Sequence, residues 1–360
     1  MSRTSIWNTI TKREIAMRYA NDLPLKRISI DELVALPSIH PAVISLVQEL
    51  STLQLGAGVL PGALRSLLKS QESIVDPLID DMFMSVTTAA AESDLADLMY
   101  QHRRILRICK SSAQCSDEAR PVYEAEWNDK VCAPMLELAL EADRDLEESL
   151  IFHNTKDARI TPLFEDDNAV LQNNTVDYGI FATPAVMSRP LAQLNALDDF
   201  EIDRPLVIAI ETSDGDGNAP SQLANFARAH FRAVRYLLSA SNQMANSSRG
   251  VSPVIRASSV TKPVTGPPML PLIEVSGSSW QVSFAVLDGS KVLVSSDLPI
   301  GSTERLSRCY VLLHSLLRLA RWARSEYTEW WTAQLQASQG QATLDGSKYL
   351  RESGELVERC

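Results

Sequence analysis

The spacing of hydrophobic positions predicts a helical first half of the chain. Short apolar periods between residues 39 and 69, interrupted by Gly and Pro, predict two short helices around a tight turn. Apolar positions at helical spacing continue over about 76–109 and about 118–150, which predicts two longer helices. Residues 1–35 are polar and mixed, and we expect them to form a loosely held, flexible leader.

The pattern of the second half changes to one that is typical of a sheet with helices. Residues 175–183 (TVDYGIFAT) are rich in β-formers, and residues 205–212 (PLVIAIET) form the aliphatic run of a strand buried on both faces. The elements predicted after this strand are a helix at 221–239, strands at 272–275, 280–287 and 291–295, and a helix at 303–336. Residues 241–268, rich in Ser, Pro and Val, predict a loop insertion. The succession predicts an α/β or α+β core.

Composition and charge narrow the class of protein. The 360 residues are 45% hydrophobic, and 34 Lys and Arg against 45 Asp and Glu give a net charge of −11. An acidic chain is a poor candidate for indiscriminate binding to a phosphate backbone, so any contact with nucleic acid needs a local basic face. Five scattered cysteines without a C-x-x-C pair exclude a disulfide scaffold and a zinc ribbon. With neither a signal peptide nor a transmembrane segment in the pattern, we expect an intracellular protein of the cytoplasm or nucleus, without membrane contact.

Acidic residues near the ends of the predicted strands are the first candidates for chemistry. Asp177 lies among apolar residues of one strand, Glu211 ends the next, and Glu124 and Glu126 lie on the long helix before them. Carboxylates at strand ends converge readily on one cleft, and Mg²⁺ takes one or two carboxylates together with waters. The alternative for each is a solvated side chain or a helix-cap partner, although a buried Asp177 would need partners.

Three arginines form the candidate contact for phosphate or substrate. Arg228, Arg232 and Arg235 recur at helical spacing on the helix that follows Glu211. They would place a local basic face beside the carboxylates, where DNA could bind. The alternative is an ordinary solvated helix face.

The order of several segments resembles one known family. These segments are YEAEWNDKVCAPMLELAL, NTKDARI, VDYGIF, PLVIAIETS and QLANF. Together they resemble the PD-(D/E)XK nuclease-like domain proteins of filamentous fungi, over about residues 45–332. The resemblance implies an α/β, restriction-endonuclease-like core with a mixed sheet flanked by helices. The implied organisation is an N-terminal helical extension at 36–112, the core at 113–336 and a C-terminal tail at 337–360.

The resemblance also implies a Mg²⁺ site and a set of catalytic residues. In that superfamily a helix Glu, a strand Asp and the Glu of an E-x-K motif bind the metal, which polarises the phosphate and lowers the pKa of the attacking water. The Lys of E-x-K orients or deprotonates that water and offsets negative charge in the transition state. The matching positions are Glu124 (with Glu126 as second choice), Asp177, Glu211 and the carbonyl of Thr212 as metal ligands, with Gln222 resembling the Gln of a Q-x-x-x-Y element.

The sequence departs from this family at the catalytic lysine. E-x-K reads Glu211-Thr212-Ser213, and Ser213 at the catalytic position neither carries positive charge nor acts as a base without an activator. Lys130 or Lys156 would have to replace the lysine.

Three hypotheses therefore stay open. The first is Mg²⁺-dependent phosphodiester hydrolysis of DNA. The second is a metal-independent small-molecule enzyme of cyclase or isomerase type in fungal secondary metabolism, with Asp177 and Glu211 as acid, base or hydrogen-bonding groups. The third is a catalytically inactive binding scaffold, because the fold alone does not fix the function.

Overall fold

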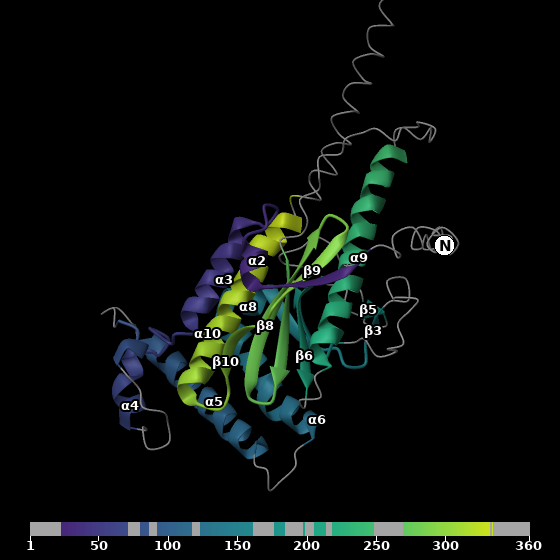
Figure 1. The fold of residues 1–360 in the computed structure, drawn as a ribbon. Helices are drawn as coiled ribbons and strands as arrows, with labels where there is room; N and C mark the ends of the chain where they lie inside the picture. Colours follow the sequence, from purple (N-terminus) through teal and green to yellow (C-terminus); the bar gives the residue numbers. More distant parts are fainter. Residues whose placement is uncertain are drawn as a thin grey trace, which may run out of the picture.

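A mixed β-sheet with helices on both faces forms the centre of the molecule (Figure 1). The computed structural model describes residues 23–70, 80–85, 92–116, 123–160, 176–183, 197–198, 205–213, 218–247, 269–331 and 333. Within these ranges the sheet has eight strands in the order β1-β9-β8-β7-β6-β4-β2, with β10 paired to β8. The predicted α/β class is confirmed.

The strands that carry the predicted carboxylates lie next to one another. The sheet consists of β1 (Leu25–Ile28), β2 (Leu150–Asn154), β4 (Tyr178–Ala182), β6 (Leu206–Ser213), β7 (Leu270–Ser276), β8 (Ser279–Asp288), β9 (Lys291–Ser295) and β10 (Leu298–Ser302). Strand β6 pairs parallel to β7 and antiparallel to β4, and its residues from Leu206 to Thr212 are all buried. This two-sided burial explains why its sequence is a continuous aliphatic run. The short strands β3 (Arg159–Ile160) and β5 (Leu197–Asp198) pair separately.

The two faces of the sheet are covered by different helices (Figure 1). Helix α9 (Ala219–Ser247) lies on one face, while the other carries α3 (Pro41–Leu53), α5 (Glu92–Cys115), α7 (Ala133–Glu141) and α10 (Leu306–Trp322). The shorter helical elements are α2 (Ile30–Val34), η1 (Gly62–Leu64), α4 (Arg65–Ser70), η2 (Asp80–Met82), α6 (Glu124–Trp127), η3 (Asn128–Cys132), α8 (Arg144–Ser149) and η5 (Ala323–Tyr327).

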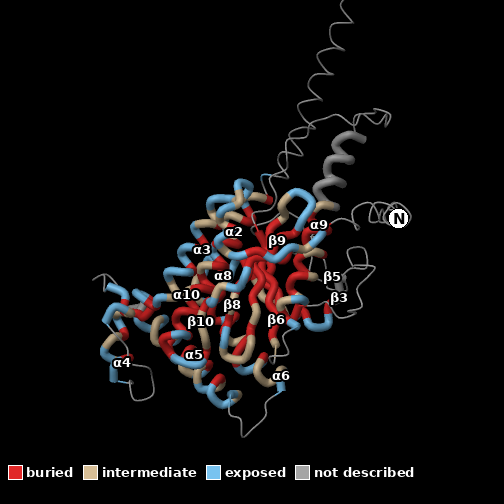
Figure 2. Tube along the Cα trace, viewed as in Figure 1, coloured by how far each residue is buried: buried red, intermediate tan, exposed pale blue. Residues whose placement is uncertain are grey.

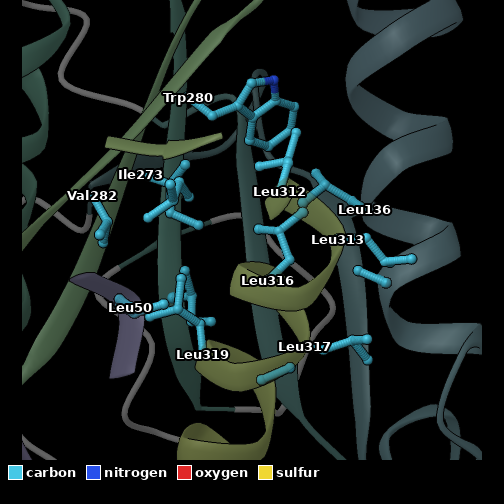
Figure 3. Packing of buried hydrophobic residues seen from close by; sticks show 14 of the residues in the cluster. Leu50, Leu136, Ile273, Trp280, Val282, Leu312, Leu313, Leu316, Leu317 and Leu319 are labelled. Atoms are coloured by element: carbon cyan, nitrogen blue, oxygen red, sulfur yellow. The ribbon is translucent and has the colours of Figure 1, made fainter. Parts of the chain in front are cut away.

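The core lies between the sheet and these helices, as the band of buried residues in Figure 2 shows. In Figure 3, leucines of α10 such as Leu312 and Leu316 point toward Ile273 and Trp280 of the sheet. The aliphatic stripe of α10 is thereby removed from water, which stabilises the layer by about 25 cal/mol per Å² of apolar surface. Among the described residues no helix combines the length and the apolarity needed to cross a bilayer.

The N-terminal region is more ordered than its polar composition predicts. Within the expected leader, Leu25–Ile28 forms β1 and pairs with β9. Ser29 then caps α2, because its hydroxyl accepts a bond from Glu32 N–H while the Glu32 carboxylate accepts one from Ser29 N–H. Residues 1–22 lie outside the described residues.

The predicted helix at 118–150 is divided in the structure. A π-helical turn, η3, follows α6, and α7 ends at Glu141. Asp143 then caps α8, and Leu150 takes an extended conformation that starts β2. No strand was predicted over residues 151–154, which follow directly on the predicted helix.

Other differences concern the ends of elements. Helix α5 begins at Glu92 rather than near residue 76, and α9 extends to Ser247, inside the expected loop insertion at 241–268. Strand β10 was not predicted. Residues 248–268 and 334–360, which include the expected C-terminal tail at 337–360, lie outside the described residues.

Candidate metal and catalytic site

Asp177 and Glu211 lie opposite each other where β4 begins and β6 ends. The pairing of Tyr178 with Ile210 puts the two carboxylate-bearing residues side by side, and Asp177 N–H donates to Glu211 Oε2 at 3.2 Å. Thr155, which follows β2, fixes this segment: its N–H donates to the Asp177 carbonyl at 2.7 Å and its hydroxyl donates to the Val176 carbonyl. Three neighbouring strands therefore position the two carboxylates.

Burial sets the electrostatics of this pair. The exposed fractions of Asp177 and Glu211 are only 7% and 6%. Burial, followed by the negative charge of Asp177, raises the pKa of Glu211 to about 9. At neutral pH Glu211 is therefore protonated as long as no metal ion binds beside it.

A hydroxyl and an amide organise Asp177 from the opposite side. The backbone N–H of Thr212 donates to Asp177 Oδ2 at 2.9 Å, and the Thr212 hydroxyl donates to the same oxygen. Asn128 Nδ2 donates in turn to the Thr212 hydroxyl oxygen at 3.1 Å. These bonds fix the orientation of the Asp177 carboxylate.

Lys156 brings a positive charge to the carboxylates. It lies two residues after β2, and its Nζ donates to Glu124 Oε1 at 2.6 Å. The bond to Glu124, and then the negative charges of Asp177, Glu124 and Glu211, raise the pKa of Lys156. The ammonium group is thus within electrostatic reach of all three carboxylates and stays charged at neutral pH.

The same geometry separates the two candidate helix glutamates. Glu124 interacts with Lys156 and adds to the electrostatic field at Glu211. Glu126 pairs with Lys130 one helical turn further on, where the Lys130 side chain is about half exposed. Of the two glutamate–lysine pairs, the structure places Glu124 and Lys156 beside Glu211.

The remaining predicted residues lie along β6 and α9. Ser213 ends β6, two residues after Glu211, and is half-buried. Gln222 lies in the first turn of α9, where its N–H donates to the Asn218 carbonyl. Phe226, at the Tyr position of the Q-x-x-x-Y element, is fully buried.

The three arginines do not form one exposed basic face. Arg228 is half-buried and donates to Asn225 Oδ1, whereas Arg232 is buried. Arg235 donates to the carbonyl of Gly289, in the turn between β8 and β9. Helix α9 runs back along the sheet at about 1.5 Å per residue. Arg235 therefore lies at the opposite ends of the strands from Glu211. The expectation of a continuous basic face beside the carboxylates is corrected accordingly.

The donor set fits a Mg²⁺ site of the two-carboxylate type. Within the described part of the chain no three His, Cys, Asp or Glu side chains converge as a complete metal cage. Asp177 and Glu211 do converge, and such a buried pair is relieved of repulsion only by a proton or a cation. Mg²⁺ ordinarily takes a shell of one or two carboxylates that waters complete. The backbone carbonyl of Thr212 would supply a further oxygen here.

Sequence reasoning missed Asn128 and Thr155. Thr155 follows β2, a strand that was not predicted, so nothing marked it. Asn128 had a weak signal, since it is a polar residue directly after Trp127 in a helix that otherwise buries apolar side chains.

Comparison with known proteins identifies the family. A family model described as the PD-(D/E)XK nuclease superfamily matches residues 71–328. The match covers more than half of the chain, which therefore belongs to this superfamily, and the expected nuclease-like fold is confirmed. No curated protein and no solved structure matches the chain significantly.

Proposed function

We propose that the protein is a Mg²⁺-dependent nuclease that hydrolyses phosphodiester bonds of DNA. The observation that carries the proposal is the position of Lys156, which supplies the positive charge that Ser213 lacks. Asp177, Glu211 and the carbonyl of Thr212 would hold the ion. Bound there, Mg²⁺ polarises the scissile phosphate and lowers the pKa of the attacking water.

The raised pKa of Lys156 defines what this residue does. An ammonium group that stays protonated is not a general base, so Lys156 acts by stabilising the negative charge that develops on the phosphate. Glu124 is the positioning residue for Lys156, since it accepts the bond from Nζ at 2.6 Å. Glu124 thereby contributes through the lysine as well as through its own charge.

A metal-independent small-molecule enzyme, of cyclase or isomerase type, is the second candidate. The raised pKa of Glu211 favours it, because a buried protonated carboxyl is a proton donor at neutral pH. Such an enzyme needs an enclosed pocket at its acid. A cavity of about 250 Å³ is lined by Leu55, Val59, Met82, Arg308 and neighbouring residues, and none of its lining residues belongs to the elements that carry the carboxylates. We favour the nuclease, because Lys156 brings to the carboxylates the positive charge that suits a phosphodiester substrate.

Cleavage assays with two lysine variants test the proposal. We expect Lys156→Met to slow Mg²⁺-dependent cleavage of labelled single- or double-stranded DNA by about 100-fold or more, the usual effect of removing one group that stabilises transition-state charge. Lys130→Met is the matched control, since Lys130 also pairs with a glutamate of the same helical segment, and it should stay within about twofold of wild type. Full activity of Lys156→Met would contradict the role of Lys156. A wild-type protein inactive with both Mg²⁺ and Mn²⁺ would contradict the nuclease itself.

A further inference from the structure

Asn128 occupies an irregular position in the helix beside the carboxylates. It opens the π-helical turn η3, in which the N–H of Ala133 bonds the Asn128 carbonyl five residues back. Single π-turns within α-helices occur frequently at functional sites. Asn128 is 6% exposed, whereas its neighbours Asp129 and Lys130 are exposed. The turn thus directs one polar side chain inward.

The hydrogen bonds fix which way the Asn128 amide points. The Thr212 hydroxyl has one proton, and it donates that proton to Asp177 Oδ2. Its oxygen must therefore accept from Asn128, so the NH₂ group faces Thr212. The result is a directed chain of donors from Asn128 through Thr212 to Asp177, in which each bond polarises the next. Both Thr212 donors fall on Oδ2, so neither of them occupies Oδ1 of Asp177, the oxygen that we assign to the cation.

The other end of the same amide is not satisfied. Asn128 Oδ1 is buried and has no hydrogen-bond partner among the described residues. A half-satisfied buried amide costs folding free energy, and an apolar side chain of similar shape would avoid that cost. The fold alone therefore gives no reason for an asparagine here, whereas the bond to Thr212 does.

We propose that Asn128 is a positioning residue of the metal site, which acts through the Thr212 hydroxyl to hold the Asp177 carboxylate in its cation-binding orientation. This inference rests on the proposed function, because it requires that Asp177 binds a divalent cation. Partners behind a metal ligand typically contribute 10–100-fold to metal affinity, so we expect a loss of about tenfold when the amide is removed.

The test is a double-mutant cycle read out as Mg²⁺ affinity by isothermal titration. Asn128→Leu and Thr212→Val should each weaken binding about tenfold, and the double variant should be no weaker than Thr212→Val alone. Thr212→Ser keeps the hydroxyl and should retain the wild-type affinity. Trp127→Phe is the matched control, because it removes the indole nitrogen of the adjacent residue. This nitrogen is also buried without a hydrogen-bond partner in the described part of the chain, and its removal should leave the Mg²⁺ affinity unchanged. Asn128→Leu should melt at or above the wild-type temperature, because the unsatisfied oxygen is lost.

Each alternative outcome overturns the inference. Wild-type Mg²⁺ affinity in Asn128→Leu, or the same further loss when this change is added to Thr212→Val, would show that Asn128 does not act through Thr212. A large drop in the melting temperature, or failure of Asn128→Leu to fold, would show that the amide serves the fold. Asp177→Ala separates the two proposals. If Asp177→Ala abolishes Mg²⁺ binding and Asn128→Leu leaves it intact, only the role of Asn128 is overturned. A wild type that binds no Mg²⁺ overturns the proposed metal site as well.

Discussion

The chemistry of the site begins with two buried acidic side chains at neighbouring strand ends, Asp177 and Glu211. Asp177 and Glu211 lie at the ends of neighbouring antiparallel strands, joined by the bond from Asp177 N–H to Glu211 Oε2. Burial and the charge of Asp177 raise the pKa of Glu211 to about 9, so the proton resides on Glu211 at neutral pH. A divalent cation that binds both oxygens has to displace this proton.

The displacement predicts a pH-dependent affinity for Mg²⁺. At pH 7 the binding of one ion should release close to one proton, and the affinity should rise as the pH approaches 9. Isothermal titration in buffers of different ionisation enthalpy measures this release directly. Glu211→Gln, which has no proton to lose there, should bind more weakly and release none. Zero release by the wild type would contradict the raised pKa.

The raised pKa of Glu211 also determines how the stability of the fold depends on pH. Glu211 has a higher pKa in the folded chain than the ordinary 4.5, so the folded state holds the extra proton between these values. Stability without metal should therefore fall as the pH rises from about 5 to 9, and saturating Mg²⁺ should reduce the fall. Urea denaturation across this range measures it, and a flat profile in the absence of metal would contradict the account.

At the scale of elements, the packing of β10 against α10 depends on one glycine. Gly301 has a φ of 141°, and a Cβ there would lie 2.6 Å from the backbone nitrogen of Leu312. Neither the conformation nor the contact tolerates a side chain, so the strand can lie this close to the helix only with glycine.

Substitution of this glycine should therefore be costly. We expect Gly301→Ala to lower the free energy of unfolding by about 2–4 kcal/mol, through backbone strain and the displacement of α10. Gly289, in the β8–β9 turn, also has positive φ, but no atom of the described residues lies within 4 Å of the position that a Cβ would take there. Gly289→Ala should cost only about 1 kcal/mol. Equal midpoints of the two variants in urea would contradict the close packing.

Hydrophobic spacing predicted the elements whose burial repeats regularly. It located β6 from its continuous aliphatic run and α9 from its helical spacing, as well as the strands β8 and β9. It did not locate β2, which follows α8 without a connecting loop, since Leu150 is both the C-cap residue of α8 and the first residue of the strand. Nor did it locate β10, a short strand that pairs with β8 and carries Gly301.

Only part of the candidate site could be predicted from the sequence. Asp177 and Glu211 stood out because acidic residues are rare in apolar strands, and the structure brings them together. The choice of Lys156 over Lys130, and of Glu124 over Glu126, depends on how β2 and α6 approach each other in space. Spacing along the chain carries no information on that approach.

At the scale of the whole molecule, the net charge of the chain opposes the binding of DNA that a nuclease requires. The chain carries a net charge of −11, which repels a phosphate backbone. The described site adds three acidic side chains, of which Glu211 is protonated without a metal ion, and one ammonium group. In the nuclease that we propose, productive binding of DNA there would depend on the cation and Lys156 together, so we regard the cation site as the central claim.

The most direct measurement is cleavage of end-labelled DNA by the wild type and by Asp177→Asn, with Mg²⁺ or with a chelator. The account predicts Mg²⁺-dependent cleavage by the wild type that is at least about 100-fold slower in Asp177→Asn. Asp145→Asn, a change at an exposed residue of α8, should cleave at the wild-type rate. Cleavage by Asp177→Asn at the wild-type rate, or no Mg²⁺-dependent cleavage by the wild type, would contradict the account.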